Sequence, residues 1–298
     1  MPASLPGGVR TIGGVDPHRC RIPSRCRHRR NRRGDPPHSR GNTRRVVIAG
    51  GSVRPRGMRI ERPIMEESAE RIVALVVGGG QGRRFQGGGG VRLPKPLVRL
   101  GEKPVLVHAL ERLAEVADAF VVVFPPRQEN AFRRAVTGVG RPVTFVAGGG
   151  TRQASVFQGL RKIAPPCLVL VHDAVRPFPP RGMIRAAIEA AREEGAAVPA
   201  LSLADTVAVV GGDSILAIPD RERLVRLQTP QVFRYDLLRR AHEAARHRPS
   251  FATDDATLVR ALGAEVRIVP GSLQNLKITT LEDLAFARFL LETGSVSP

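Results

Sequence analysis

The sequence predicts an α/β fold: a Rossmann-like, mainly parallel sheet with helices on both faces and a protruding β-arm. Three observations carry this prediction. From residue 71 onward, short apolar runs alternate with longer segments of helical period. Several of these runs end at glycine, proline or polar residues, where ligands bind in open parallel sheets. The alternation breaks once, near residues 203–226. Strands and helices in alternation indicate a sheet covered on both faces.

The predicted strands are short, rich in Val, Ile and Phe, and bounded by turn residues. In chain order they are Ile72–Val77, Phe120–Phe124, Val143–Val146, Cys167–Val171, Ala196–Leu201 and Glu265–Val269. The predicted helices show apolar residues three and four apart. They are Pro104–Ala117, Gln128–Thr137, Gln153–Ile163, Pro180–Glu194, Tyr235–Arg246, Asp254–Leu262 and Leu281–Glu292. Asp254 and Asp255 are read as the N-cap and a first-turn acid of their helix, in preference to a catalytic carboxylate pair.

The break in the alternation predicts the arm. Within Asp205–Arg226, two short extended runs flank Gly211-Gly212-Asp213, a combination typical of a β-hairpin. A hairpin that protrudes from a compact domain often grips a second subunit, so the arm, about 203–226, is expected to support dimerisation.

The basic charge is concentrated at the N-terminus. Residues 1–64 hold 16 Arg, no Lys and three acids, and so carry +13 of the formal charge of +20. One interpretation is a disordered basic extension that binds nucleic acid. The favoured one is a mis-assigned start, with translation beginning at Met58 or Met65. With no Trp and one Tyr, a stacking surface for single strands is poorly supplied, and a nucleic-acid partner is not expected. Residues 65–298 are predicted to form one folded domain.

Membrane association and disulfides are not expected. No apolar run approaches the roughly 20 residues that span a bilayer. Three scattered cysteines are too few for a disulfide framework, which favours a cytoplasmic setting.

A glycine-rich loop follows the first predicted strand. It runs through Gly78-Gly79-Gly80-Gln81-Gly82-Arg83-Arg84 to Pro94-Lys95-Pro96. Glycines can adopt positive φ and let backbone N–H groups approach phosphate oxygens, while Arg84 and Lys95 would add positive charge. The sequence therefore predicts a phosphate site, although neither the P-loop nor the dinucleotide-binding pattern fits.

Further motifs follow in a fixed order. They are GGGTRQASV at 148–156, VHDAVRP at 171–177, ADT at 204–206, DR at 220–221, QTPQ at 228–231, TDDA at 253–256 and NLKIT at 275–279. Together with the glycine loop, this ordered set resembles the 2-C-methyl-D-erythritol 4-phosphate cytidylyltransferases over roughly Arg71–Leu291. A cytidylyltransferase for another polyol phosphate, such as ribitol 5-phosphate, shares most of these motifs and stays open as an alternative.

The resemblance implies roles for individual residues. The catalytic residues would be Arg84, Lys95, Arg221 and Lys277. The CTP site would comprise Gly78, Gly79, Gly80, Gly82, Gly149, Ser155, Asp173 and Ala174, and the polyol phosphate site Asp173, Arg176, Thr206, Arg221, Thr229 and Lys277. The resemblance also implies Mg²⁺ held mainly by triphosphate oxygens, and a homodimer whose arms reach into the neighbouring active sites. His172, one step along the strand from Asp173, is expected to face the opposite side and to be structural.

Overall fold

The computed structural model describes residues 70–79, 93–247 and 252–296. The expectations for residues 1–64, both the basic extension and the alternative start, lie outside the described residues, as do Gly80, Gly82 and Arg84. No helix in the described part of the chain is long and apolar enough to cross a membrane.

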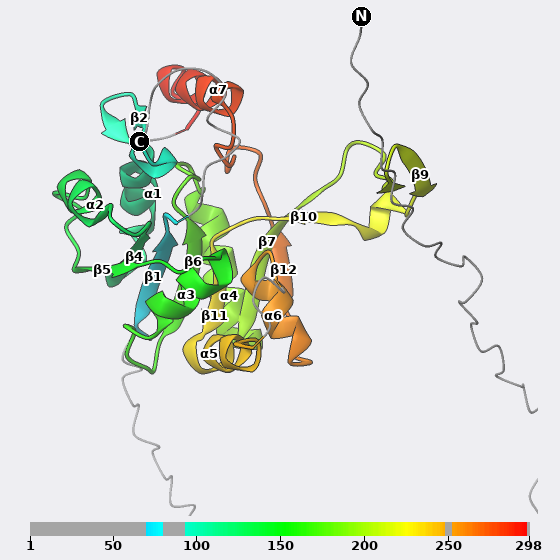
Figure 1. Ribbon diagram of the computed structural model, residues 1–298, viewed down its shortest axis with the longest axis horizontal. Helices are drawn as coiled ribbons and strands as arrows, with labels where there is room; N and C mark the ends of the chain where they lie inside the picture. Colours follow the sequence, from blue (N-terminus) through cyan, green and yellow to red (C-terminus); the bar gives the residue numbers. More distant parts are fainter. Residues whose placement is uncertain (1–69, 80–92, 248–251, 297–298) are drawn as a thin grey trace, which may run out of the picture. The chain divides into compact units, whose positions relative to one another are not determined.

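The centre of the fold is an eight-stranded mixed sheet (Figure 1). Its order is β10-β7-β11-β6-β1-β4-β5, and β12 pairs with β7. The strands are β1 (Ile72–Val77), β4 (Ala119–Phe124), β5 (Val143–Ala147), β6 (Leu168–Asp173), β7 (Ala196–Ser202), β10 (Val225–Leu227), β11 (Gln231–Arg234) and β12 (Arg267–Pro270). The six predicted strands are confirmed, with ends shifted by at most two residues.

Parallel pairing brings four strand ends to one edge. The pairs β6–β1, β1–β4 and β4–β5 are all parallel, with Val77 opposite Asp173 and Val123. The carboxyl ends of β1, β4, β5 and β6 therefore share an edge, where the glycine-rich segments after β1 and β5 also begin.

One strand of the main sheet was not expected. β11 lies between β6 and β7 and runs antiparallel to both. β10, which the sequence assigned to the end of the arm, pairs antiparallel with β7 and belongs to the main sheet. The sheet is still mainly parallel around β1, but its other half is mixed.

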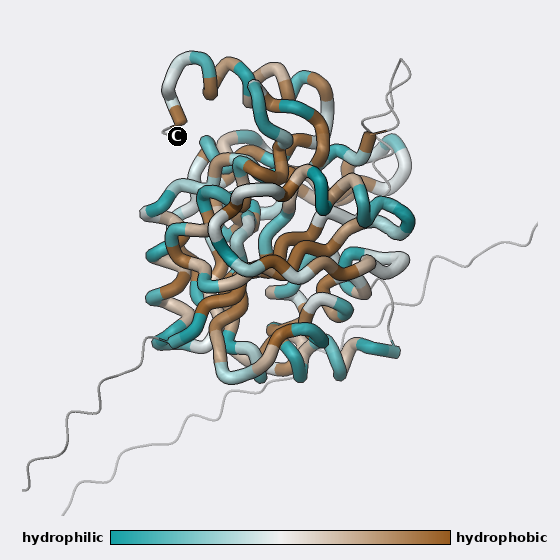
Figure 2. Tube along the Cα trace, turned by 90° about the vertical axis from the view of Figure 1, so that its left-hand side faces the viewer, coloured by the Kyte–Doolittle hydropathy of each residue, from teal (hydrophilic) through white to brown (hydrophobic). Residues whose placement is uncertain are grey.

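Helices cover both faces, as predicted. One face packs α1 (Val105–Leu113), α2 (Glu129–Ala135) and α4 (Arg181–Glu194) against Ala74 and Val76. The other packs α3 (Arg152–Leu160), α5 (Tyr235–Ala244) and α6 (Asp255–Ala261) against Val73 and Leu75. Because successive residues of β1 point to opposite faces, its fully apolar sequence suits burial on both sides. The apolar stretches accordingly run through the middle of the fold (Figure 2).

A smaller cluster forms around α7 (Leu281–Glu292). Leu284, Ala287 and Leu290 pack with Leu100 of β2 (Arg99–Leu100), which pairs with β3 (Lys103–Pro104). The helix begins with a capping box, in which Thr280 and Asp283 each accept a bond from the other's backbone N–H. This cap fixes the backbone between Lys277 and the first turn of α7.

The arm is a hairpin, as predicted. β8 (Val209–Gly211) pairs antiparallel with β9 (Ser214–Ala217), and the turn residue Gly212 has φ of +60°. The hairpin stands away from the main sheet, and the chain returns to it through the short 3-10 helix η3 (Arg221–Arg223) (Figure 1).

Candidate active site

Two adjoining clefts open at the shared edge of the parallel strands. The first, about 190 Å³, is lined by Val77, Gly78, Gly79, Lys95, Pro96, Arg152, Asp173, Val175 and Lys277. The second, about 480 Å³, is lined by Gly79, Pro125, Pro126, Gly148, Gly149, Gly150, Thr151, Arg152 and Ser155. Gly79 and Arg152 line both, so they mark the junction of the two clefts.

The glycines of the site serve close packing. A Cβ on Gly78 would lie 2.7 Å from Cε1 of Phe132 and 3.0 Å from the Val123 carbonyl oxygen, and one on Gly149 would lie 2.6 Å from Cβ of Ala154. Neither glycine has a positive φ. The ability of glycine to adopt positive φ, noted for the loop after β1, is therefore not used at Gly78, nor at Gly149. They need glycine because neighbouring chain and side chains leave no room.

The second cleft is built at the start of α3. Thr151 caps the helix, its Oγ1 accepting from the Ala154 N–H at 3.1 Å. Buried Ser155 accepts from the Gly149 N–H at 3.1 Å and donates to the Thr151 carbonyl at 2.8 Å. The hydroxyl of Ser155 thus holds the glycine turn closed over the helix N-terminus, on the wall of the cleft.

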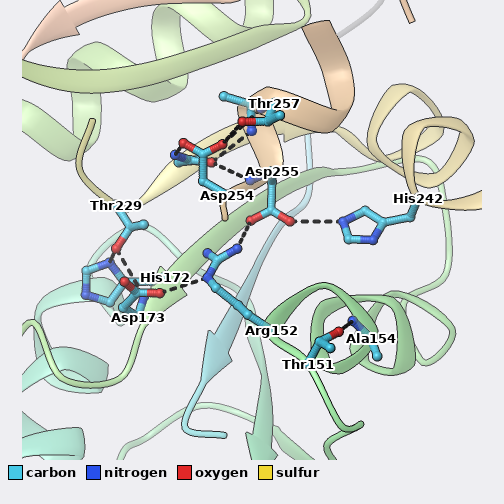
Figure 3. Close-up of polar contacts among 12 residues, drawn as sticks. Thr151, Arg152, Ala154, His172, Asp173, Thr229, His242, Asp254, Asp255 and Thr257 are labelled. Atoms are coloured by element: carbon cyan, nitrogen blue, oxygen red, sulfur yellow. Dashed lines mark hydrogen bonds and ion pairs between the residues drawn. The ribbon is translucent and has the colours of Figure 1, made fainter. Parts of the chain in front are cut away.

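Asp173, the last residue of β6, is the carboxylate of the first cleft. Its Oδ2 lies 2.8 Å from Lys277 Nζ and 3.9 Å from Arg176 Nε. Its Oδ1 accepts from Arg152 Nε at 3.2 Å, a bond drawn in Figure 3. Burial alone would raise the pKa of Asp173, but Arg152 and Lys277 outweigh that effect and lower the pKa. Asp173 therefore stays ionised and orients three cations around the cleft.

Lys95 enters the first cleft from the 3-10 helix η2 (Lys95–Leu97). Its Nζ donates to the Thr279 carbonyl at 2.7 Å, which ties the glycine-loop side of the cleft to the segment carrying Lys277. Two residues far apart in the sequence are thereby placed on one cleft, as the motifs predicted.

Asn275 anchors the segment that carries Lys277 through hydrogen bonds. Its buried amide donates to the Thr229 carbonyl at 2.8 Å, and its backbone carbonyl accepts from Arg176 Nη1 at 2.7 Å. Gln228 bonds both ways to Ser272, at 2.9 and 3.1 Å. These bonds fix the backbone on either side of Lys277 relative to β6.

His172 is structural, as predicted. Its Nε2 donates to the Arg176 carbonyl at 3.0 Å, and its Nδ1 accepts from the Thr229 hydroxyl at 3.1 Å. That hydroxyl in turn accepts from the Asp173 N–H at 3.1 Å. Burial lowers the pKa of His172 to about 4, so the ring is neutral and braces the end of β6.

Some predicted site residues do not meet in this chain. Thr206 and Arg221 lie on the arm, and Arg221 Nη1 donates to the Ala204 carbonyl at 2.7 Å. Among the described residues that line the two clefts, the arm supplies none. Thr229 and Ala174 are buried next to the end of β6, so they pack beneath the site.

Arg152 is the site residue that the sequence analysis missed. It is the first residue of α3 and bridges two carboxylates, Asp173 and Asp255, the latter through Nη1 at 2.7 Å (Figure 3). Asp254 and Asp255 are the N-cap and first-turn acid of α6, as predicted. Asp255, however, also ties the site to His242, whose Nε2 lies 2.9 Å away. The local sequence signal for this role is an Arg that directly follows a glycine-rich turn and the N-cap residue of a helix.

Known proteins resemble the chain over the region that carries the site. The sequence model of the family described as 2-C-methyl-D-erythritol 4-phosphate cytidylyltransferase matches residues 72–293. A protein of that name from Pelotomaculum thermopropionicum is 40% identical, over 75% of this chain and 95% of its own length. The "Bifunctional enzyme IspD/IspF" of Desulforudis audaxviator is 44% identical over 75% of this chain, which spans 57% of that longer protein.

A solved structure resembles the fold as well. The crystal structure of the protein named 2-C-methyl-D-erythritol 4-phosphate cytidylyltransferase from Thermus thermophilus superposes with a TM-score of 0.62 at 36% identity. The superposition covers 74% of this chain and 99% of the Thermus chain.

Proposed function

The chain belongs to the 2-C-methyl-D-erythritol 4-phosphate cytidylyltransferase family, and from that premise we propose that its two clefts hold the two reactants of cytidylyl transfer. The family is one of nucleotidyltransferases, and its reaction joins the CMP of CTP to 2-C-methyl-D-erythritol 4-phosphate, releasing pyrophosphate. The match favours this substrate over another polyol phosphate.

The junction of the clefts at Gly79 and Arg152 is the observation that carries the proposal. The larger cleft is walled by glycine backbone and Ser155, which suits a flat pyrimidine edge. The smaller cleft gathers Lys95, Lys277 and Arg152 around one carboxylate, which suits phosphate groups. A nucleotide with its base in the larger cleft and its phosphates in the smaller one would place its α-phosphorus near the junction.

The proposed chemistry is in-line displacement at that phosphorus. An oxygen of the polyol phosphate attacks, a new P–O bond forms, and the bond to the β-phosphate oxygen breaks as pyrophosphate leaves. Both reactants are anions, so catalysis is charge neutralisation and positioning, and the attacking phosphate oxygen needs no general base. We assign transition-state stabilisation to Lys95 and Arg84, and placement of the polyol phosphate to Lys277, Arg176 and Arg221.

A divalent cation, Mg²⁺, fits this scheme as a partner of the triphosphate. Among the residues that the structure describes, no group of three or more His, Cys, Asp or Glu side chains is arranged to hold a metal ion. Both oxygens of Asp173 already face cations. We therefore place Mg²⁺ mainly on triphosphate oxygens, where it neutralises charge.

We further propose a homodimer with shared active sites. The hairpin exposes a run of large apolar side chains, with Val210, Ile215, Leu216 and Ile218 each 62–67% exposed. Exposed apolar patches of this kind mark interaction sites. Arg221 and Thr206 lie beside this patch on the arm, so a second copy that covered it would receive them. A cytoplasmic setting is also proposed, from the three scattered cysteines.

The test is pyrophosphate release by the purified chain with CTP and Mg²⁺. We expect turnover with 2-C-methyl-D-erythritol 4-phosphate and far less with ribitol 5-phosphate. Replacing CTP by ATP, whose purine is larger, should abolish the reaction and serves as the control for the nucleotide cleft. Turnover with ribitol 5-phosphate alone would overturn the substrate assignment.

A further inference from the structure

Asp255 is a buried carboxylate one layer behind the clefts. It is the first residue of α6, 1% exposed, and it is absent from the described residues that line either cleft. It nevertheless bonds directly to Arg152, which lines both. Figure 3 shows Asp255, Arg152 and Asp173 in a row, with the guanidinium between the two carboxylates.

The guanidinium of Arg152 is divided between its two partners. Nη1 bonds Asp255 at 2.7 Å, while Nε bonds Asp173 at 3.2 Å. A guanidinium beside a single carboxylate favours a fork of two parallel bonds. Here Nη1 is held by Asp255, Asp173 receives one bond from Arg152, at Oδ1, and the buried Nη2 has no hydrogen-bond partner among the described residues.

The consequence for the cleft lies in the other oxygen of Asp173. Oδ2 is free to meet Lys277 Nζ at 2.8 Å. Lys277 is 43% exposed at its side chain, so Asp173 is the contact that holds its ammonium over the cleft. If Arg152 turned to bring a second N–H to Oδ2, it would compete with Lys277 for that oxygen and weaken the contact. Asp255 could thus influence the position of Lys277 without touching it.

Asp255 is itself held rigidly. His242 Nε2 donates to its Oδ1 at 2.9 Å, and Gln231 Oε1 accepts from the N–H groups of Asp255 and Ala256, both at 3.2 Å. The His242 ring stacks on Phe157 at 6.2 Å between centroids. Burial raises the pKa of Asp255, but Arg152 and His242 outweigh it and lower the pKa, so the group stays anionic.

We propose that Asp255 and His242 are positioning residues for substrate binding: through Arg152 they keep one oxygen of Asp173 available to Lys277 and so hold the lysine where the polyol phosphate binds. The inference rests on the proposed role of Lys277. The inference assigns different roles to the two acids of the TDDA motif. Asp254 caps α6, accepting from the Thr257 N–H at 2.9 Å, and accepts from Gln231 Nε2 at 3.3 Å, but it has no bond to Arg152.

The test compares Asp255→Asn with Asp254→Asn by steady-state kinetics and thermal melting. Asn keeps the volume of Asp255 but removes its charge, so Arg152 turns toward Asp173. We expect the KM for 2-C-methyl-D-erythritol 4-phosphate to rise about tenfold, the order of magnitude that loss of a residue supporting a ligand costs at metal sites, with kcat changed much less. Asp254→Asn is the matched control, because Asn caps helices as well as Asp and KM should not change.

Two more variants keep the inference testable whatever the stability of Asp255→Asn. His242→Phe keeps a ring on Phe157 but removes the donor, and it should raise the same KM by a smaller factor. In a Lys277→Ala background, Asp255→Asn should add less than twofold, because both act through one contact.

The outcomes separate this inference from the proposed function. Wild-type turnover with an unchanged KM in both Asp255→Asn and His242→Phe would overturn the inference alone. Failure of both variants to fold would assign the pair to stability and overturn it equally. Absence of wild-type turnover would instead contradict the proposed function.

Discussion

Lys95 reaches the first cleft with its ammonium against the Thr279 carbonyl. We expect Lys95→Ala to lower kcat about 10²- to 10³-fold, the cost of removing one stabilising donor from a transition state, with the melting temperature nearly unchanged. Lys103→Ala is the control, since Lys103 is exposed and paired with Glu111 away from the clefts. Single-turnover measurement of CMP transfer would check both. A kcat near wild type in Lys95→Ala would contradict its assignment.

His172 makes the protein sensitive to mild acid. Its pKa is about 4 in the fold and about 6.5 in an unfolded chain, so between these values the unfolded state binds more protons. Stability contributed by the neutral ring is fully present above pH 6.5 and declines as the pH falls toward 4. The difference in pKa corresponds to roughly 3 kcal/mol in the free energy of unfolding. Urea unfolding from pH 7 to 4.5 should show this loss.

A His172→Asn variant is the comparison for that pH series. It removes the titrating ring, so its free energy of unfolding should fall less steeply with acid than that of the wild type. His108, whose pKa burial also lowers, is present in both chains and cancels. Parallel pH profiles would show that His172 does not control the acid sensitivity.

The predicted residues that the structure brings to one cleft differ in kind from Arg152, which the sequence analysis did not single out. Lys95, Asp173 and Lys277 follow strand ends or stand in ordered motifs, and the parallel sheet brings them to one cleft. The bond between Arg152 and Asp255 joins residues 103 positions apart on two helices. No local pattern encodes such a pair, because only the packing of α3 against α6 decides which buried charges meet.

Helix α3 and strand β1 are packed as closely as their backbones allow. A Cβ on Gly159 would lie 2.6 Å from Cδ1 of Leu75, which is fully buried. Gly159→Ala should therefore lower the free energy of unfolding by about 1–3 kcal/mol, the usual cost of overpacking. Gly182→Ala in α4 is the matched control, because no atom of the described residues lies within 4 Å of the position its Cβ would take.

The control should move in the opposite direction. Alanine is favoured over glycine in helices, so Gly182→Ala should raise the free energy of unfolding by up to about 1 kcal/mol. Urea titration of both variants checks the pair. Shifts of the same sign in the two variants would contradict the close packing of α3 on β1.

The ends of elements whose apolar residues recur regularly along their whole length, such as β1 and α7, were predicted nearly to the residue. β11 was not, because only Val232 and Phe233 among its four residues are apolar and Pro230 precedes it. Its antiparallel place between β6 and β7 is set by long-range pairing. Strand order is a property of the assembled sheet, so the alternation of elements could predict a parallel core but not this insertion.

At the scale of the whole molecule, a shared active site predicts rescue between inactive chains. In a mixed dimer of Arg221→Ala and Lys95→Ala chains, one site would combine an intact cleft with an intact arm. Random exchange of equal amounts makes about half the dimers mixed, so activity should recover to about a quarter of wild type. Pyrophosphate release after subunit exchange measures it.

The control mixture joins Lys95→Ala with Lys277→Ala. Both lysines line the same cleft of one chain, so neither site of a mixed dimer is complete and activity should stay low. No recovery in the first mixture, once exchange is demonstrated with labelled subunits, would argue against the interlocked dimer.

The insertion of β11 also bears on how the chain is made. The ribosome synthesises β6 and β7 before β11, yet among the strands of the described residues β11 alone joins β7 to the β1–β6 half of the sheet. Until Gln231–Arg234 emerges, nascent β6 therefore has one unpaired apolar edge, at the very strand that ends in Asp173. Such edges recruit other strands, so chains that stop short of residue 231 should be the species that chaperones must shield.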